Sequence, residues 1–99
     1  MKPLDILNYY KERSTTDLIC DSVLQRLQQY GEPVTTNKLV TDCTVEGIAS
    51  PATTHHKLER LKEIGYVMSY NHPKDKDNRK RWIRVGARGD VYLQKWMQP

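Results

Sequence analysis

The sequence predicts a mainly helical α+β fold with a three-helix core, a β-hairpin and extra helices at both ends. The clearest helix start in the chain, Ser50-Pro51, opens an amphipathic segment that leads directly into two strand-like segments, residues 66–70 and 81–85. Positive charge is concentrated in the same region. Residues 49–88 hold ten Lys/Arg against four Asp/Glu, whereas residues 1–48 hold five against seven. This order of elements and charge is typical of a winged helix-turn-helix domain.

The chain is long enough for one domain. With 99 residues and 37% apolar composition, it can fill one small core. We expect a single domain over residues 1–99: a core and wing in residues 14–86, an N-terminal arm or helix in residues 1–13, and a C-terminal helix in residues 87–99. A core this thin favours burial against a second copy, so the sequence predicts a homodimer.

The sequence also bears on location and partners. No apolar run is long enough to cross a membrane, and no signal-peptide pattern is visible, so no membrane association is expected. Cys20 and Cys43 form no CxxC pair, which favours a reduced, cytoplasmic setting in which both are small core residues. The sequence pI near 9.1 allows nucleic acid, an anionic surface or an acidic protein as partner.

Residues 1–13 are expected to form a short amphipathic helix or arm, with Pro3 near its start. Its apolar side, together with the last helix of the chain, is the expected dimer interface. The residues of that interface are Leu4, Leu7, Tyr10, Tyr92, Leu93 and Trp96.

Two helices are predicted next. Ser14 to Asp17 resembles a capping box, in which Asp17 would stand at the third helical position. The helix that follows should stop at Gly31, and its apolar residues recur every three or four positions: Ile19, Val23, Leu27 and Tyr30. A second, shorter helix is predicted from Thr35 or Thr36 to near Thr44. A short strand at residues 32–34 can precede it and pair with the hairpin.

The helix predicted over residues 50–64 is the most strongly marked. The Ser50 hydroxyl can accept a backbone N–H of the first turn, and Pro51 has its φ already set for the first helical position. The buried face should consist of Thr54, Leu58 and Leu61, with Gly65 ending the helix.

A hairpin and a last helix complete the chain. Residues 66–70 and 81–85 are rich in β-branched and aromatic side chains, and the polar residues 71–80 between them should form the tip. Gly86 and Ala87 lead into the last helix, which contains the i,i+4 pairs Tyr92/Trp96 and Leu93/Met97.

The exposed face of the 50–64 helix suits contact with base edges. Its first half is small and polar, and the major groove, about 12 Å wide, admits one helix. Thr53 can offer a methyl group or a hydroxyl to a base, and His56 can donate to guanine. Ala52 shares this face, while His55 and Lys57 lie at its flanks. The alternative is an ordinary solvated face on a three-helix core.

The hairpin tip and second strand form a dense cationic run. From Lys74 to Arg84 the sequence has six Lys/Arg and only Asp75 and Asp77 as acids. A protruding loop must be polar in any case, but six cations exceed what solubility needs. They can bind phosphates and place an arginine in an A·T-rich minor groove, and Asp77 can brace an arginine two residues away.

Neither catalysis nor a cofactor is expected. The histidines and cysteines show no metal-ligand spacing, and His55 and His56 point about 100° apart on a helix. No phosphate loop, Gly-rich elbow or pair of carboxylates on one helix face marks an active site. Tyr66, Tyr70 and Trp82 can stack on unpaired bases, which would indicate single-stranded nucleic acid, but packing is the favoured use.

Two runs of residues carry a family resemblance. The first is Ser50-Pro51-Ala52-Thr53 with Leu58, Arg60-Leu61 and Gly65, and the second is Asp77-Asn78-Arg79 with Val85 and Gly89. Over residues 34–90 the sequence thus resembles the recognition helix and wing of MarR-type winged helix regulators. The resemblance implies a homodimeric DNA-binding transcriptional regulator in which Arg79 enters the minor groove and Asp77 steadies it.

The sequence departs from that family in three respects. Residues 39–50 are longer than the family's turn, so residues 43–48 should form an extended helix end or a loop. Val85-Gly86 stands where the family has Leu-Thr, which removes a capping hydroxyl. The chain is also shorter than typical members, so we expect a pared-down regulator without a sizeable effector pocket.

These observations together predict a sequence-specific, repressor-type regulator that binds double-stranded DNA. Residues 50–64 would lie in the major groove and residues 71–80 in the minor groove, with half-sites roughly 10 bp apart or a multiple of that. The expected DNA contacts are Ser50, Ala52, Thr53, His55, His56, Lys57, Arg60, Lys74, Lys76, Asp77, Arg79, Lys80 and Arg81. Two alternatives stay open: a non-specific or architectural DNA binder, and a winged helix that docks an acidic protein partner.

Overall fold

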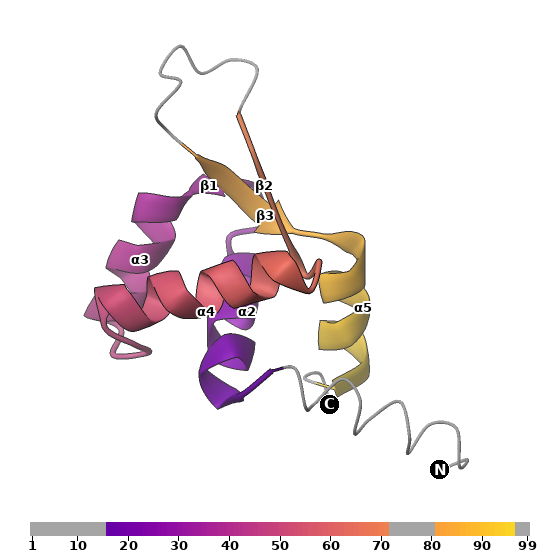
Figure 1. The fold of residues 1–99 in the computed structure, drawn as a ribbon, viewed down its shortest axis with the longest axis horizontal. Coiled ribbons are helices and arrows are strands. Elements are labelled where there is room, and N and C mark those ends of the chain that lie inside the picture. Colours follow the sequence, from indigo (N-terminus) through magenta and orange to yellow (C-terminus); the bar gives the residue numbers. More distant parts are fainter. Residues whose placement is uncertain (1–15, 72–80, 97–99) are drawn as a thin grey trace.

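A computed structural model describes residues 16–71 and 81–96. Within them the order of elements is α2 (Leu18–Gln29), β1 (Val34–Thr35), α3 (Thr36–Val45), α4 (Pro51–Glu63), β2 (Val67–Tyr70), β3 (Trp82–Val85) and α5 (Ala87–Trp96) (Figure 1). The strands form one antiparallel sheet in the order β1-β3-β2. The predicted mainly helical winged helix fold is confirmed. The predicted arm at residues 1–13 and most of the hairpin tip, residues 72–80, lie outside the described residues.

Helix α2 begins later than the sequence predicts. Asp17 stands at the N-cap in an extended conformation (φ −128°, ψ −179°), and its Oδ1 accepts a hydrogen bond from the backbone N–H of Cys20 at 2.8 Å. The expected position of Asp17 inside the first turn was therefore wrong. The physical reason is that aspartate is itself among the best N-cap residues. As predicted, the chain turns away at Gly31, whose φ is +71°.

Strand β1 and helix α3 follow in the predicted order. The strand lies slightly later than residues 32–34 and pairs with β3, with Val34 opposite Ile83. Thr35 caps α3, because its hydroxyl accepts a hydrogen bond from the backbone N–H of Lys38 at 3.3 Å. The start of α3 is thereby attached to the edge of the sheet.

The connection from α3 to α4 is an extended helix end followed by a short turn. Helix α3 continues to Val45, and Gly47 then adopts a φ of +74°. The backbone N–H of Ile48 returns to the carbonyl of Cys43 at 2.9 Å, which satisfies a carbonyl at the helix end.

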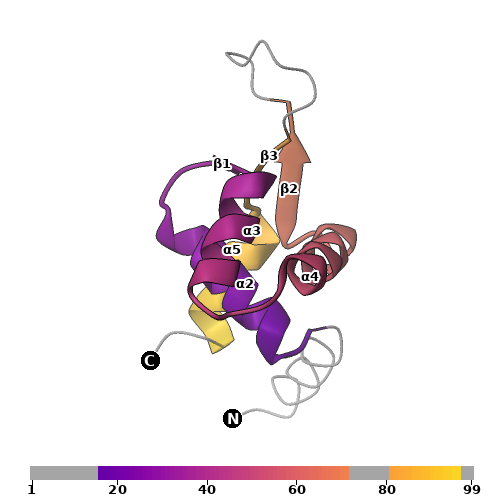
Figure 2. The same ribbon diagram turned by 90° about the vertical axis from the view of Figure 1, so that its left-hand side faces the viewer.

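Helix α4 and the hairpin agree closely with the prediction. The Ser50 hydroxyl accepts a hydrogen bond from the backbone N–H of Thr53 at 3.2 Å, and Pro51 occupies the first turn. The helix ends before Gly65, whose φ is +82°. Strands β2 and β3 each begin one residue later than expected, and they extend away from the helices (Figures 1 and 2).

The core lies between the helices and the inner face of the sheet. It is formed by Cys20, Val23, Leu24, Leu27, Val34, Leu39, Cys43, Leu58, Leu61, Tyr66, Val67, Ile83, Tyr92 and Leu93. The expected burial of both cysteines is confirmed, and this burial raises the pKa of each thiol. Tyr66 is a core residue, whereas Tyr70 and Trp82 are cross-strand partners on the other face of the sheet and are half-buried.

Candidate nucleic-acid interface

Helix α4 presents the face that its sequence predicts. Thr54, Leu58 and Leu61 are fully buried, because they recur on one side of the helix and pack into the core. On the opposite side Ala52 and His56 are exposed, together with His55 at the flank and Arg60 in the second half. The described surface therefore offers a small, polar first half that can approach another molecule closely.

Thr53 is held by the helix cap and is half-buried. The Ser50 hydroxyl, besides accepting from the backbone N–H of Thr53, donates to its hydroxyl oxygen at 3.0 Å. These two hydrogen bonds restrict the side-chain rotamer of Thr53. A fixed hydroxyl and methyl group suit the reading of a base better than a rotating side chain, because less rotamer entropy is lost on binding.

The cations of α4 are paired with carboxylates. Lys57 Nζ lies 2.6 Å from Asp17 Oδ2, Arg60 Nη1 lies 3.5 Å from Glu63 Oε2, and Lys62 Nζ lies 2.9 Å from Glu59 Oε1. The charge of this helix is therefore balanced locally. Its exposed face is suited to hydrogen bonding and close approach more than to long-range attraction of phosphates.

The second arm of the hairpin carries cations of a different kind: Arg81 directly precedes β3 at its tip end, and Arg84 lies within β3. Arg81 and Arg84 are exposed, and no carboxylate of the described residues lies within ion-pair distance of either guanidinium. Arg81 Nη1 donates to the amide oxygen of Asn71 at 3.0 Å, and Arg84 Nη2 lies 3.3 Å from the sulfur of Met68. These two side chains keep their charge available to an anionic partner.

Part of the predicted wing is not placed. Lys74, Lys76, Asp77, Arg79 and Lys80 lie outside the described residues, so their expected contacts stay predictions. The predicted contact set omitted Arg84. Strand alternation could have found it, because Ile83 points into the core and its neighbour must point outward.

The start of α3 also belongs to this surface. The backbone N–H of Thr36 donates to the carbonyl of Arg81 at 3.0 Å, which places the first turn of α3 beside the tip end of β3 (Figure 1). Asn37 and Lys38 in that turn are exposed. Neither residue was among the predicted DNA contacts, although pairing of a strand before α3 with the hairpin was predicted.

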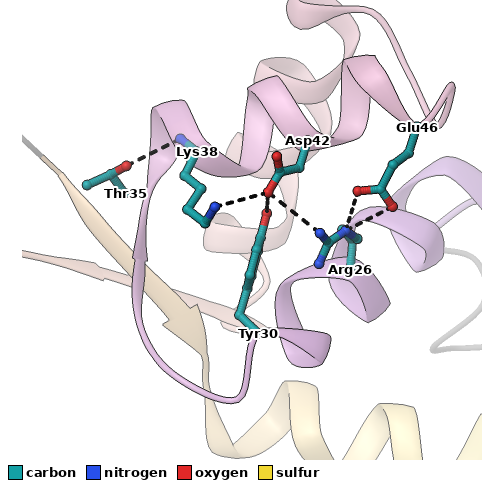
Figure 3. Close-up of polar contacts among 6 residues, drawn as sticks. All are labelled: Arg26, Tyr30, Thr35, Lys38, Asp42 and Glu46. Atoms are coloured by element: carbon teal, nitrogen blue, oxygen red, sulfur yellow. Dashed lines mark hydrogen bonds and ion pairs between the residues drawn. The ribbon is translucent and has the colours of Figure 1, made fainter.

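A polar network fixes α3 against α2 (Figure 3). The Tyr30 hydroxyl donates to Asp42 Oδ2 at 2.6 Å, and the Arg26 guanidinium lies over the Tyr30 ring, 4.4 Å from its centroid. Arg26 Nε also donates to Glu46 Oε2 at 2.8 Å. Burial and the hydrogen bond to Asp42 raise the pKa of Tyr30, and the same hydrogen bond lowers the pKa of Asp42. The network stabilises the arrangement of the two helices that precede α4.

The residues expected at a dimer interface have mixed positions. Tyr92 and Leu93 lie in the core of the chain itself, 2% and 0% exposed, so their burial is complete without a second copy. Trp96 is half-buried against that core, and Val91 on α5 is 60% exposed. Leu4, Leu7 and Tyr10 lie outside the described residues.

Asp17 should make stability depend on pH in the acid range. Its hydrogen bond from Lys57, followed by that from Cys20, lowers its pKa below the ordinary value of 3.8. A carboxyl whose pKa is lowered by folding stabilises the folded state above its ordinary value, and this contribution is lost as the pH falls through the lowered pKa. Because half of the side chain is exposed, solvent screening keeps the effect small.

Thermal unfolding of wild type and Asp17→Asn between pH 5 and pH 2.5 checks this prediction. The variant should lose less of its melting temperature on acidification than the wild type does. Equal losses would mean that the ion pair contributes nothing to folding.

The described residues hold no helix that could cross a membrane and no group of three or more potential metal ligands. Their arrangement is that of a winged helix-turn-helix domain: α3 and α4 form the helix-turn-helix, and β2 and β3 form the wing.

No family model and no curated protein matches the sequence. A solved structure of a provisionally assigned MarR-like transcription regulator from Bacillus cereus ATCC 10987 is similar, with a TM-score of 0.51 and 17% identity over 95% of this chain and 74% of that one. The likeness confirms a MarR-like winged helix fold.

Proposed function

We propose that this protein is a sequence-specific regulator of transcription, of repressor type, that binds double-stranded DNA. The observation that carries the proposal is the combination of two exposed surfaces. One is the small, polar, charge-balanced first half of α4, and the other is the second arm of the hairpin, whose Arg81 and Arg84 have no carboxylate partner among the described residues. The similarity to a protein described as a transcription regulator supports it.

Within this proposal α4 lies in the major groove. Ala52, Thr53 and His56 face the base edges, because they occupy the exposed side of its first half. Ser50 orients Thr53 through its hydroxyl, while His55 and Arg60 lie close enough to the exposed face to meet the DNA backbone.

The hairpin supplies attraction and the second groove contact. Arg81 and Arg84 bind phosphates, and the tip adds Lys74, Lys76 and Lys80. Arg79 enters the minor groove and Asp77 steadies it, as the MarR resemblance implies. Two copies of the chain bind half-sites roughly 10 bp apart or a multiple of that.

Thr53→Ala and His56→Ala should each weaken binding to the preferred duplex by about 1–3 kcal/mol, because each removes a contact to a base. Affinity for a scrambled duplex should stay nearly constant. Fluorescence anisotropy titrations with both duplexes check this, and Gln94→Ala on the exposed side of α5 is the control. Equal losses on both duplexes would assign these residues to the DNA backbone.

An experiment that needs no knowledge of the operator tests the interface. Backbone amide shifts of the labelled protein are recorded while mixed-sequence duplex DNA is added. The largest changes should fall on residues 52–56, 81–84 and 36–38, and α5 should change little. If duplex DNA causes no changes while an acidic polypeptide changes the same amides, the protein-docking alternative is correct. Changes centred on α5 would contradict the proposed interface.

A further inference from the structure

The described lysine and arginine side chains of α2, α3 and α4 all lie within ion-pair distance of a carboxylate. The pairs are Arg26–Glu46, Arg26–Asp42, Lys38–Asp42, Lys57–Asp17, Arg60–Glu63 and Lys62–Glu59. In the described structure Arg81 and Arg84 of the hairpin have no such partner. Among the elements of the proposed interface, attraction of phosphates therefore belongs mainly to the hairpin, and a cation of α4 that is paired outside its own helix can have another use.

The pair between Lys57 and Asp17 differs from the other two pairs of α4. Arg60–Glu63 and Lys62–Glu59 are i,i+3 pairs inside the helix, so they cannot attach it to anything else. Lys57 instead reaches the N-cap of α2, forty positions earlier in the chain. It stands next to the buried Leu58, and its side chain is only 22% exposed. This pair joins α4 to the helix on which it packs.

Asp17 uses both oxygens of its carboxylate. Oδ1 accepts from the backbone N–H of Cys20 at 2.8 Å, and Oδ2 accepts from the ammonium of Lys57 at 2.6 Å. A single carboxylate therefore holds the start of α2 and the flank of α4 at one point. Lys57 would have to break this short contact before it could reach a phosphate.

We propose that Lys57 is a positioning residue. Its ion pair with Asp17 sets the orientation of α4 against α2, and through it the fit of Thr53 and His56 to the bases. Lys57 then contributes to the discrimination between DNA sequences. Its position in the sequence had suggested a contact with a phosphate instead. The inference rests on the proposed DNA-binding function and names a determinant of its specificity.

Two variants separate positioning from phosphate binding. Lys57→Met keeps the aliphatic stem and removes the charge, while Asp17→Asn keeps an N-cap acceptor of equal quality and removes the carboxylate. Affinity is measured at several salt concentrations for the duplex that the wild type enriches from a random pool and for a scrambled duplex. Lys62→Met is the matched control, because its side chain is 25% exposed and its partner lies in α4 itself.

Each variant should lower the ratio of specific to non-specific affinity by about two- to fivefold. The double variant should lower it no further than either single variant, because both remove the same interaction. The slope of log affinity against log salt should stay as in the wild type. Lys62→Met should change neither quantity.

A phosphate contact gives the opposite pattern. Lys57→Met would then weaken binding to both duplexes equally and reduce the salt slope by about 0.9, while Asp17→Asn would strengthen binding to both. That result, or an unchanged affinity ratio in both variants, overturns the inference. If the wild type itself prefers no duplex, the proposed function fails and the inference falls with it, and this outcome is visible before any variant is made.

Discussion

Gly89→Ala should destabilise the protein by about 2 kcal/mol or more, because no space exists for a methyl group at this position. A Cβ on Gly89 would overlap the carbonyl oxygen of Tyr66 and lie 2.8 Å from Val85 Cγ1. Helix α5 would have to move away from the end of α4 and from the sheet. Helix propensity alone predicts the opposite sign, since alanine favours a helix over glycine by about 1 kcal/mol. The sign of the change therefore decides between close packing and propensity.

Thermal and urea unfolding measure this effect. A loss of about 2 kcal/mol corresponds to a fall in melting temperature of roughly 10 °C for a domain of this size. Gln94→Ala, on the exposed side of the same helix, should change stability by less than about 0.5 kcal/mol. A Gly89→Ala variant as stable as the wild type would show that α5 does not pack as closely as described.

Tyr92→Phe should cost about 1–3 kcal/mol, because it removes a hydrogen bond to a buried carboxyl group. The Tyr92 hydroxyl donates to Asp21 Oδ1 at 2.7 Å, and Thr16 Oγ1 lies 3.0 Å from the same hydroxyl. Asp21 is 1% exposed, so water cannot easily replace the lost donor. The contact joins the first turn of α2 to α5, which are 71 positions apart in the sequence.

Tyr30→Phe is the matched control for this prediction. It removes a hydroxyl in the same way, but the partner carboxylate of Asp42 is 25% exposed and can accept from water instead, whereas Asp21 is buried. Urea unfolding should therefore show a larger loss for Tyr92→Phe than for Tyr30→Phe. The reverse order would mean that the buried hydrogen bond contributes little and that the network between α2 and α3 is the stronger link.

Much of the fold is visible in the sequence because its signals are local. Ser50 caps α4 through an N–H only three residues away, and Thr35 caps α3 in the same way. The buried face of α4 is equally local, since it repeats with the helical period. The exposed face that we propose to read DNA follows directly as its complement.

Helix α2 shows where local signals are insufficient. The periodic pattern finds Val23 and Leu27, but the buried face also includes Leu24 and the acidic Asp21. The face is wide because α2 packs against α4, β3 and α5. Asp21 lies within this face and accepts a hydrogen bond from the hydroxyl of Tyr92, 71 positions later in the chain. No pattern within α2 alone contains that information.

The electrostatics of the candidate site were also hidden from the sequence. The excess of Lys/Arg over residues 49–88 suggested that α4 and the hairpin attract DNA together. The structure balances the charge of α4 through Glu59, Glu63 and the distant Asp17, and leaves Arg81 and Arg84 without a described carboxylate partner. Counting charges along the chain cannot show which cations are already paired in space.

The most direct test of DNA reading by α4 is selection of bound sequences from a random duplex pool at near-physiological salt. The expected result is enrichment of an inverted repeat with half-sites roughly 10 bp apart, or a multiple of that. Binding without enrichment would contradict sequence-specific reading and favour an architectural role. Absence of binding would contradict a DNA partner altogether and favour an acidic protein.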